Sequence, residues 1–86
     1  MKIKDLIILV EKKINKNIST ENIKIEDKTF LHEKHSSHTK GKFHLKIEIF
    51  SKELKKMSKI QANKKIYNIL EFEIKEYIHS IQILIS

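Results

Sequence analysis

Residues 43–50 alternate strictly between apolar and polar side chains, and this pattern constrains the fold more than any other part of the sequence. The apolar residues share one parity: Phe43, Leu45, Ile47 and Ile49. The polar residues between them share the other: His44, Lys46 and Glu48. Successive side chains of a strand point to opposite faces of a sheet, so a period of two predicts a half-buried β-strand.

Two further segments show this period and are predicted as strands. In residues 22–27, Ile23 and Ile25 lie on one face. In residues 78–85, the histidine and three isoleucines share one parity: His79, Ile81, Ile83 and Ile85. We therefore expect three strands, with His79 near the start of the last one.

Two segments have the 3.6-residue period of an amphipathic helix. In residues 2–14 the apolar positions follow an i, i+3, i+4, i+7 spacing: Ile3, Leu6, Ile7, Val10 and Ile14. A second helix is predicted from about Glu53 to Lys75, with Ile66 and Ile69 beside its main stripe. That stripe consists of Met57, Ile60, Tyr67, Leu70 and Ile74.

The expected order is helix, strand, strand, helix, strand, within a single domain of residues 1–86. The first two strands can pair antiparallel, and a right-handed crossover makes the second and third parallel. We predict an α/β (α+β) two-layer sandwich in which both helices lie on one face of a three-stranded mixed sheet.

Composition excludes several classes of function. The chain has no cysteine, so it has no thiolate of its own for a metal or for catalysis. Its one glycine, Gly41, argues against phosphate-cradling loops, and no catalytic triad pattern is present, so we expect no enzyme. No apolar run approaches the roughly 20 residues that span a bilayer. We expect a soluble intracellular protein, either cytoplasmic or in an organelle such as the mitochondrion.

The histidines are the candidate metal ligands. Four of them lie between Thr29 and Phe50, in or just after a long polar segment: His32, His35, His38 and His44. The fifth is His79. Imidazole suits zinc, copper and iron, although histidines in a polar loop also fit a solvated surface. Their spacing matches no zinc-finger or zincin pattern, so any site is incomplete without further ligands.

Nucleic acid is the alternative partner. The formal net charge is +7, and lysines crowd the second predicted helix, with Lys59, Lys64 and Lys65 the main candidates for phosphate contacts. All 18 basic residues are lysine, whereas bidentate recognition of bases and phosphates prefers arginine. The lysine excess is also what AT-rich coding sequence produces.

Beyond these patterns, the sequence resembles the BolA family over nearly its whole length. Residues 43–51, FHLKIEIFS, resemble the family's "SHFRVVIVS" strand, and residues 57–61, MSKIQ, resemble its "KSLVQ". Residues 78–82, IHSIQ, resemble "IHALSI", the most specific motif of the set. Ala62 and Asn63 stand where the family usually has Arg-His, a motif linked to its DNA contacts.

The resemblance implies a KH-like type II fold without the GxxG loop. It also implies a heterodimer with a monothiol glutaredoxin that holds, transfers or senses a shared [2Fe–2S] cluster. Glutaredoxin and glutathione would supply thiolates, and this chain would supply histidines. The isolated chain is then expected to be monomeric and free of cluster. By position, His79 matches the family's C-terminal ligand and His35 its loop ligand, with His32 and His38 as loop alternatives.

Overall fold

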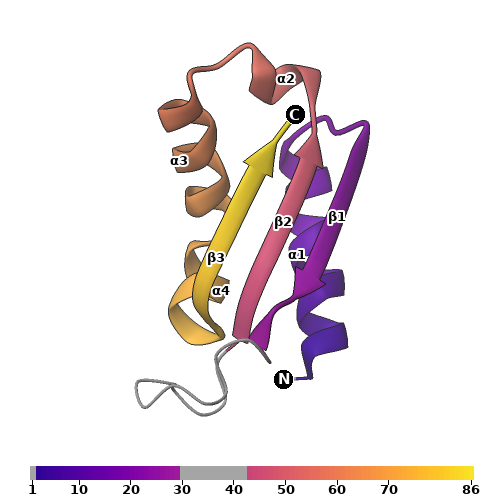
Figure 1. The fold of residues 1–86 in the computed structure, drawn as a ribbon, viewed down its shortest axis with the longest axis vertical. Coiled ribbons are helices and arrows are strands. Elements are labelled where there is room, and N and C mark those ends of the chain that lie inside the picture. Colours follow the sequence, from indigo (N-terminus) through magenta and orange to yellow (C-terminus); the bar gives the residue numbers. More distant parts are fainter. Residues whose placement is uncertain (1, 30–42) are drawn as a thin grey trace.

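The structure is a computed structural model that describes residues 2–29 and 43–86 (Figure 1). Its elements follow one another as α1 (Ile3–Asn17), β1 (Asn22–Asp27), β2 (Phe43–Phe50), α2 (Lys52–Lys55), α3 (Lys59–Ile69), α4 (Glu71–Glu76) and β3 (Ile78–Ile85). The three strands have the predicted bounds. His32, His35 and His38 lie outside the described residues.

The strands form one mixed sheet in the order β1-β2-β3. β1 pairs antiparallel with β2, and β2 pairs parallel with β3, as predicted. Asp27 lies opposite Leu45, and Phe43 lies opposite Ile78. The end of β1, the start of β2 and the start of β3 therefore meet at one end of the sheet. Residues 30–42 connect β1 to β2 at that same end.

The helices cover one face of this sheet (Figure 1), so the predicted two-layer α+β architecture is confirmed. In α1 the buried residues Leu6, Val10 and Ile14 are four positions apart and therefore lie on one side of the helix. They pack against the apolar parity of β2, in which Leu45, Ile47 and Ile49 are buried. None of the helices in residues 2–29 and 43–86 is long and apolar enough to cross a membrane.

The second predicted helix is wrong in detail, because the structure divides it into α2, α3 and α4. Two serines begin new helices. The Ser51 hydroxyl accepts a hydrogen bond from the Leu54 backbone N–H (3.2 Å), and the Ser58 hydroxyl accepts one from Gln61 N–H (3.1 Å). Such caps satisfy backbone donors that have no partner within the helix, so each serine favours a helix start at its own position.

The predicted apolar stripe of this region is correct only in part, because Leu70 is buried and Met57 and Ile74 pack against the core, whereas two of its members are exposed. Ile60 is 70% exposed and Tyr67 is exposed as well. The buried positions are Ala62, Ile66 and Leu70, spaced four apart, and of these only Leu70 belongs to the predicted stripe. The start of α3 at the Ser58 cap orients this stripe toward the sheet, and the small side chain of Ala62 is part of it.

A buried ion pair joins α4 to α1. Glu73 is only 1% exposed, and its two carboxylate oxygens lie 3.0 and 2.7 Å from the Lys13 ammonium nitrogen. Glutamate side chains are mostly exposed to solvent in folded proteins. Glu73 instead makes a contact between two helices, so its role in the described structure is to hold α4 against α1.

We expect Glu73→Gln to lower the free energy of unfolding by about 1–3 kcal/mol, because the buried carboxylate loses its charge while Lys13 keeps its own. Urea denaturation followed by circular dichroism measures this change. Glu76→Gln is the matched control, since Glu76 belongs to the same helix and is exposed. Equal stability of the two variants would contradict a stabilising role for the pair.

Candidate functional site

A β-bulge determines where His79 points. Phe43 of β2 lies opposite Ile78, but the next residue, His44, lies opposite Ser80, so His79 is the extra residue of β3. A bulge re-aims the side chains beside it. Ile78 is buried, His79 and Ser80 are both exposed, and Ile81 is again partly buried. The prediction that His79 shares a face with Ile81, Ile83 and Ile85 is therefore wrong, because strict alternation fails at the bulge.

His44 lies directly beside His79. Its side chain is on the sheet face opposite the helices and is nonetheless 4% exposed. Its Nδ1 lies 2.6 Å from the Ser80 hydroxyl, and its backbone N–H donates to the Thr29 hydroxyl (3.2 Å). The ring centroids of His44 and His79 are 5.1 Å apart, with an angle of 64° between the ring planes. The two imidazoles therefore form an edge-to-face pair at the end of the sheet.

A small pocket of about 250 Å³ adjoins this pair. It is lined by Lys28, His44, Leu45, Lys46, Ser80, Ile81 and Gln82. Among the described residues, no three His, Cys, Asp or Glu side chains are arranged to hold a metal ion. Within residues 2–29 and 43–86, the exposed imidazole at this end of the sheet is that of His79. The predicted loop ligand His35 and its alternatives His32 and His38 lie outside the described residues.

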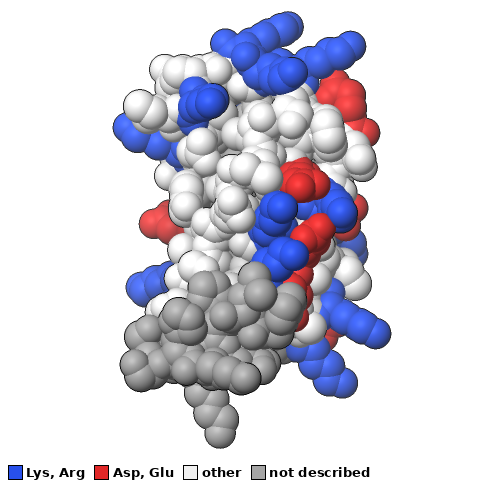
Figure 2. All heavy atoms as spheres, viewed as in Figure 1, with Lys and Arg blue, Asp and Glu red and all other residues white. Residues whose placement is uncertain are grey.

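The lysines of the sheet face beside this site are neutralised by neighbouring glutamates. Glu26 lies 2.9 Å from both Lys24 and Lys28, and Lys46 lies 3.5 Å from Glu48. Hydrogen bonds from two lysines, of which Lys28 has the larger effect and Lys24 the smaller, lower the pKa of the Glu26 carboxyl to about 2. Figure 2 shows these mixed charges over β1 and β2. This face is therefore no continuous basic surface.

The lysines proposed for nucleic acid differ in their surroundings. Lys59 and Lys64 are exposed on α3, whereas the Lys65 ammonium lies 2.8 Å from a Glu53 carboxylate oxygen. Lys59 also lines a hollow beside the end of β3, with Leu84 and Ser86. Lysine side chains gather at this end of the molecule in Figure 2, near α2. The candidate phosphate surface thus begins at the end of the sheet opposite His79.

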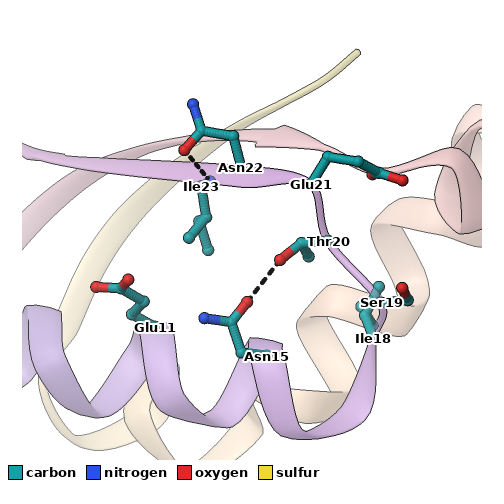
Figure 3. Close-up of a pocket in the computed structure, with 8 residues that line it drawn as sticks. All are labelled: Glu11, Asn15, Ile18, Ser19, Thr20, Glu21, Asn22 and Ile23. Atoms are coloured by element: carbon teal, nitrogen blue, oxygen red, sulfur yellow. Dashed lines mark hydrogen bonds between the residues drawn. The ribbon is translucent and has the colours of Figure 1, made fainter.

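Another hollow in the described residues lies between the end of α1 and the start of β1 (Figure 3). It measures about 500 Å³ and its lining is polar, with a hydrogen bond of 2.6 Å from the Thr20 hydroxyl to the Asn15 side-chain oxygen. Glu11 and Glu21 are its charged residues. It contains no histidine and lies at the other end of β1 from the His44–His79 pair, so it is separate from the candidate site.

Comparison with known proteins gives the class of protein. The sequence matches the family described as BolA-like protein over residues 14–86, and the chain belongs to this family. No curated protein matches the sequence.

Solved structures share the fold. The BolA domain of SufE1 from Arabidopsis thaliana has a TM-score of 0.79 and 20% identity, covering 100% of this chain and 93% of that chain. BolA1 from Arabidopsis thaliana has a TM-score of 0.78 and 22% identity, covering 92% of this chain and 87% of that chain. The BolA1 protein from Mus musculus has a TM-score of 0.74 and 16% identity, covering 92% of this chain and 62% of that chain. At these identities the likeness establishes the fold.

The sequence singled out His79, but it did not predict the contacts around His79. These contacts join three separate strands or strand ends. The buried His44 is in β2, and it makes hydrogen bonds with Ser80 of β3 and with Thr29, which follows β1. Ser80 is a polar residue in a mostly apolar strand, which was the one signal available in the sequence. The bulge itself follows from the pairing of β3 with β2, and neither strand carries a pattern that indicates it.

Proposed function

We propose that this chain pairs with a monothiol glutaredoxin to hold, transfer or sense a shared [2Fe–2S] cluster, and that it acts as a binding partner with no catalytic activity of its own. The supporting observation is the exposed His79 imidazole on a bulge, at the end of the sheet where residues 30–42 join β1 to β2. Family membership supports the same proposal. We take residues 1–86 as one BolA-like domain that acts in the cytoplasm.

The residues present fit a shared cluster better than a resident one. The described part of the chain offers one accessible imidazole, the sequence contains no cysteine, and no three-ligand group occurs among the described side chains. Histidine replaces cysteine on one iron in some [2Fe–2S] centres, so mixed ligation is chemically reasonable. In this proposal His79 and His35, or one of His32 and His38 in its place, supply nitrogen ligands. Glutaredoxin and glutathione supply the thiolates.

The test is a titration of this chain into a monothiol glutaredoxin loaded with cluster in the presence of glutathione. We expect a heterodimer on a sizing column and a changed visible absorption and circular dichroism spectrum, because nitrogen ligands replace sulfur ligands. The isolated chain, treated with iron and sulfide under the same conditions, should remain monomeric and colourless. An unchanged spectrum together with no complex would refute the proposal.

A second candidate function is nucleic-acid binding through the lysine-rich α3. The exposure of Lys59 and Lys64 favours it, whereas the ion pair between Lys65 and Glu53 removes one of the three predicted contacts. We expect DNA affinity that falls with salt, and Lys59→Ala with Lys64→Ala should reduce the slope of log K against log salt by about 2. His79→Ala should leave this affinity unchanged. Binding without salt dependence would contradict phosphate contacts.

A further inference from the structure

The orientation of the His79 ring is a separate question from its exposure. His79 is the extra residue of a bulge and its side chain is exposed, so β3 alone leaves its ring free to rotate. Ordering a mobile side chain opposes binding, because rotamer freedom is lost when the ligand engages. An imidazole already held in one orientation binds a partner's metal centre with less of this loss. What holds His79 is therefore relevant to its proposed role.

His44 is well placed to hold it, because His44 itself is firmly anchored. Its ring is 4% exposed and its Nδ1 lies 2.6 Å from the Ser80 hydroxyl. Its backbone carbonyl accepts a hydrogen bond from Lys28 N–H (2.7 Å), and its backbone N–H donates to Thr29 (3.2 Å). These contacts tie the residue to β3 through its side chain and to the end of β1 through its backbone.

The bulge couples this anchored ring to His79. The register shift places Ser80, the residue after His79, opposite His44. The same shift leaves His79 where its ring meets that of His44, with 5.1 Å between centroids and an angle of 64°. Edge-to-face contact of this kind is attractive and directional. The bulge thus brings both Ser80 and the His79 ring into contact with the same side chain, that of His44.

We propose that His44 is a positioning residue that fixes the orientation of the His79 imidazole for its partner's metal centre. The hydrogen bond between Ser80 and His44 fixes the His44 ring, and the ring contact transmits this order to His79. The functional part rests on the proposed sharing of a cluster, whereas the positioning itself is a property of the free chain. His44 acts through its ring face and edge and need not ligate metal.

The first test uses the free chain and needs no glutaredoxin. Three variants separate the contributions: His44→Ala removes the ring, His44→Phe keeps a ring without nitrogen atoms, and Ser80→Ala removes the bond to His44. In NMR spectra we expect His44→Ala to shift the His79 ring protons toward random-coil values. His44→Phe should retain ring-to-ring nuclear Overhauser contacts, and Ser80→Ala should weaken them. Leu84→Ala, at an exposed position of the same strand, should change nothing.

The second test measures affinity for glutaredoxin loaded with cluster. We expect complexes about 3- to 10-fold weaker for His44→Ala, the range of an aromatic pair contact, and a return to within about 2-fold of the intact chain for His44→Phe. Loss of the complex in His44→Phe as complete as in His79→Ala would overturn the proposal and make His44 a ligand. Unchanged His79 ring shifts in both His44→Ala and Ser80→Ala would also overturn it.

The two tests distinguish failure of this proposal from failure of the proposed function. Altered His79 shifts in the free variants, with no glutaredoxin complex formed by the intact chain, would refute the shared cluster while positioning stands. If His44→Ala does not fold, as its circular dichroism spectrum would reveal, the His79 shifts of Ser80→Ala decide the question. Ser80 is exposed, and its replacement keeps the His44 side chain while removing the hydrogen bond that fixes the His44 ring.

Discussion

Replacement of His79 by alanine is expected to abolish the spectrum of the mixed complex and to weaken cluster-dependent association at least about 100-fold, the upper end of what even outer-shell substitutions cost in metal sites. The physical reason is that the chain has no cysteine to take the place of the lost nitrogen. Because His79 is exposed on a bulge, its removal leaves no cavity, so folding should be unaffected.

This prediction is checked by visible circular dichroism of glutaredoxin loaded with cluster, titrated with the intact chain and with His79→Ala. Leu84→Ala controls for changes to the exposed face of β3 and should behave as the intact chain. An intact-like spectrum from His79→Ala would remove His79 from the ligand set. If the spectrum is lost as expected, His35→Ala is the next variant, followed by His32→Ala and His38→Ala, to identify the second ligand.

Replacement of Ile66 by alanine is expected to lower the free energy of unfolding by about 2–5 kcal/mol, because Ile66 is 0% exposed and alanine leaves a cavity in the core. A domain of this length has a total stability of about 4–13 kcal/mol. The substitution therefore removes a large share of the total. Urea denaturation monitored by circular dichroism at 222 nm, a wavelength that reports helix, gives the value.

Ile60→Ala is a matched control within the same helix. Ile60 is 70% exposed, so the change should lie within about 0.5 kcal/mol of zero. Comparison of the two variants decides which side of α3 faces the core. The 3.6-residue pattern of the sequence predicted that Ile60 is on the buried stripe, whereas the structure buries Ile66. A larger loss for Ile60→Ala than for Ile66→Ala would support that earlier orientation and contradict the structure.

The strands were the most predictable part of the fold. All three have the bounds expected from alternation, since a sheet covered by helices on one face requires every second residue to be apolar. The helices were less predictable. Lys75 was expected near the end of one long helix, but Ser51 and Ser58 begin separate helices, and Ala62 faces the core where Ile60 was expected. Apolar side chains occur all round this segment, so periodicity alone left its orientation open.

The sequence by itself determined the fold class, the family and the choice of His79 as the residue to test, because alternation and a short C-terminal motif are local properties. Only the tertiary structure decided that His79 is exposed, that His44 is buried beside it and that Glu73 pairs with Lys13. These facts depend on strand register and helix packing. A shift of one residue between β2 and β3 changes which face a side chain occupies, and no segment of the chain encodes that shift alone.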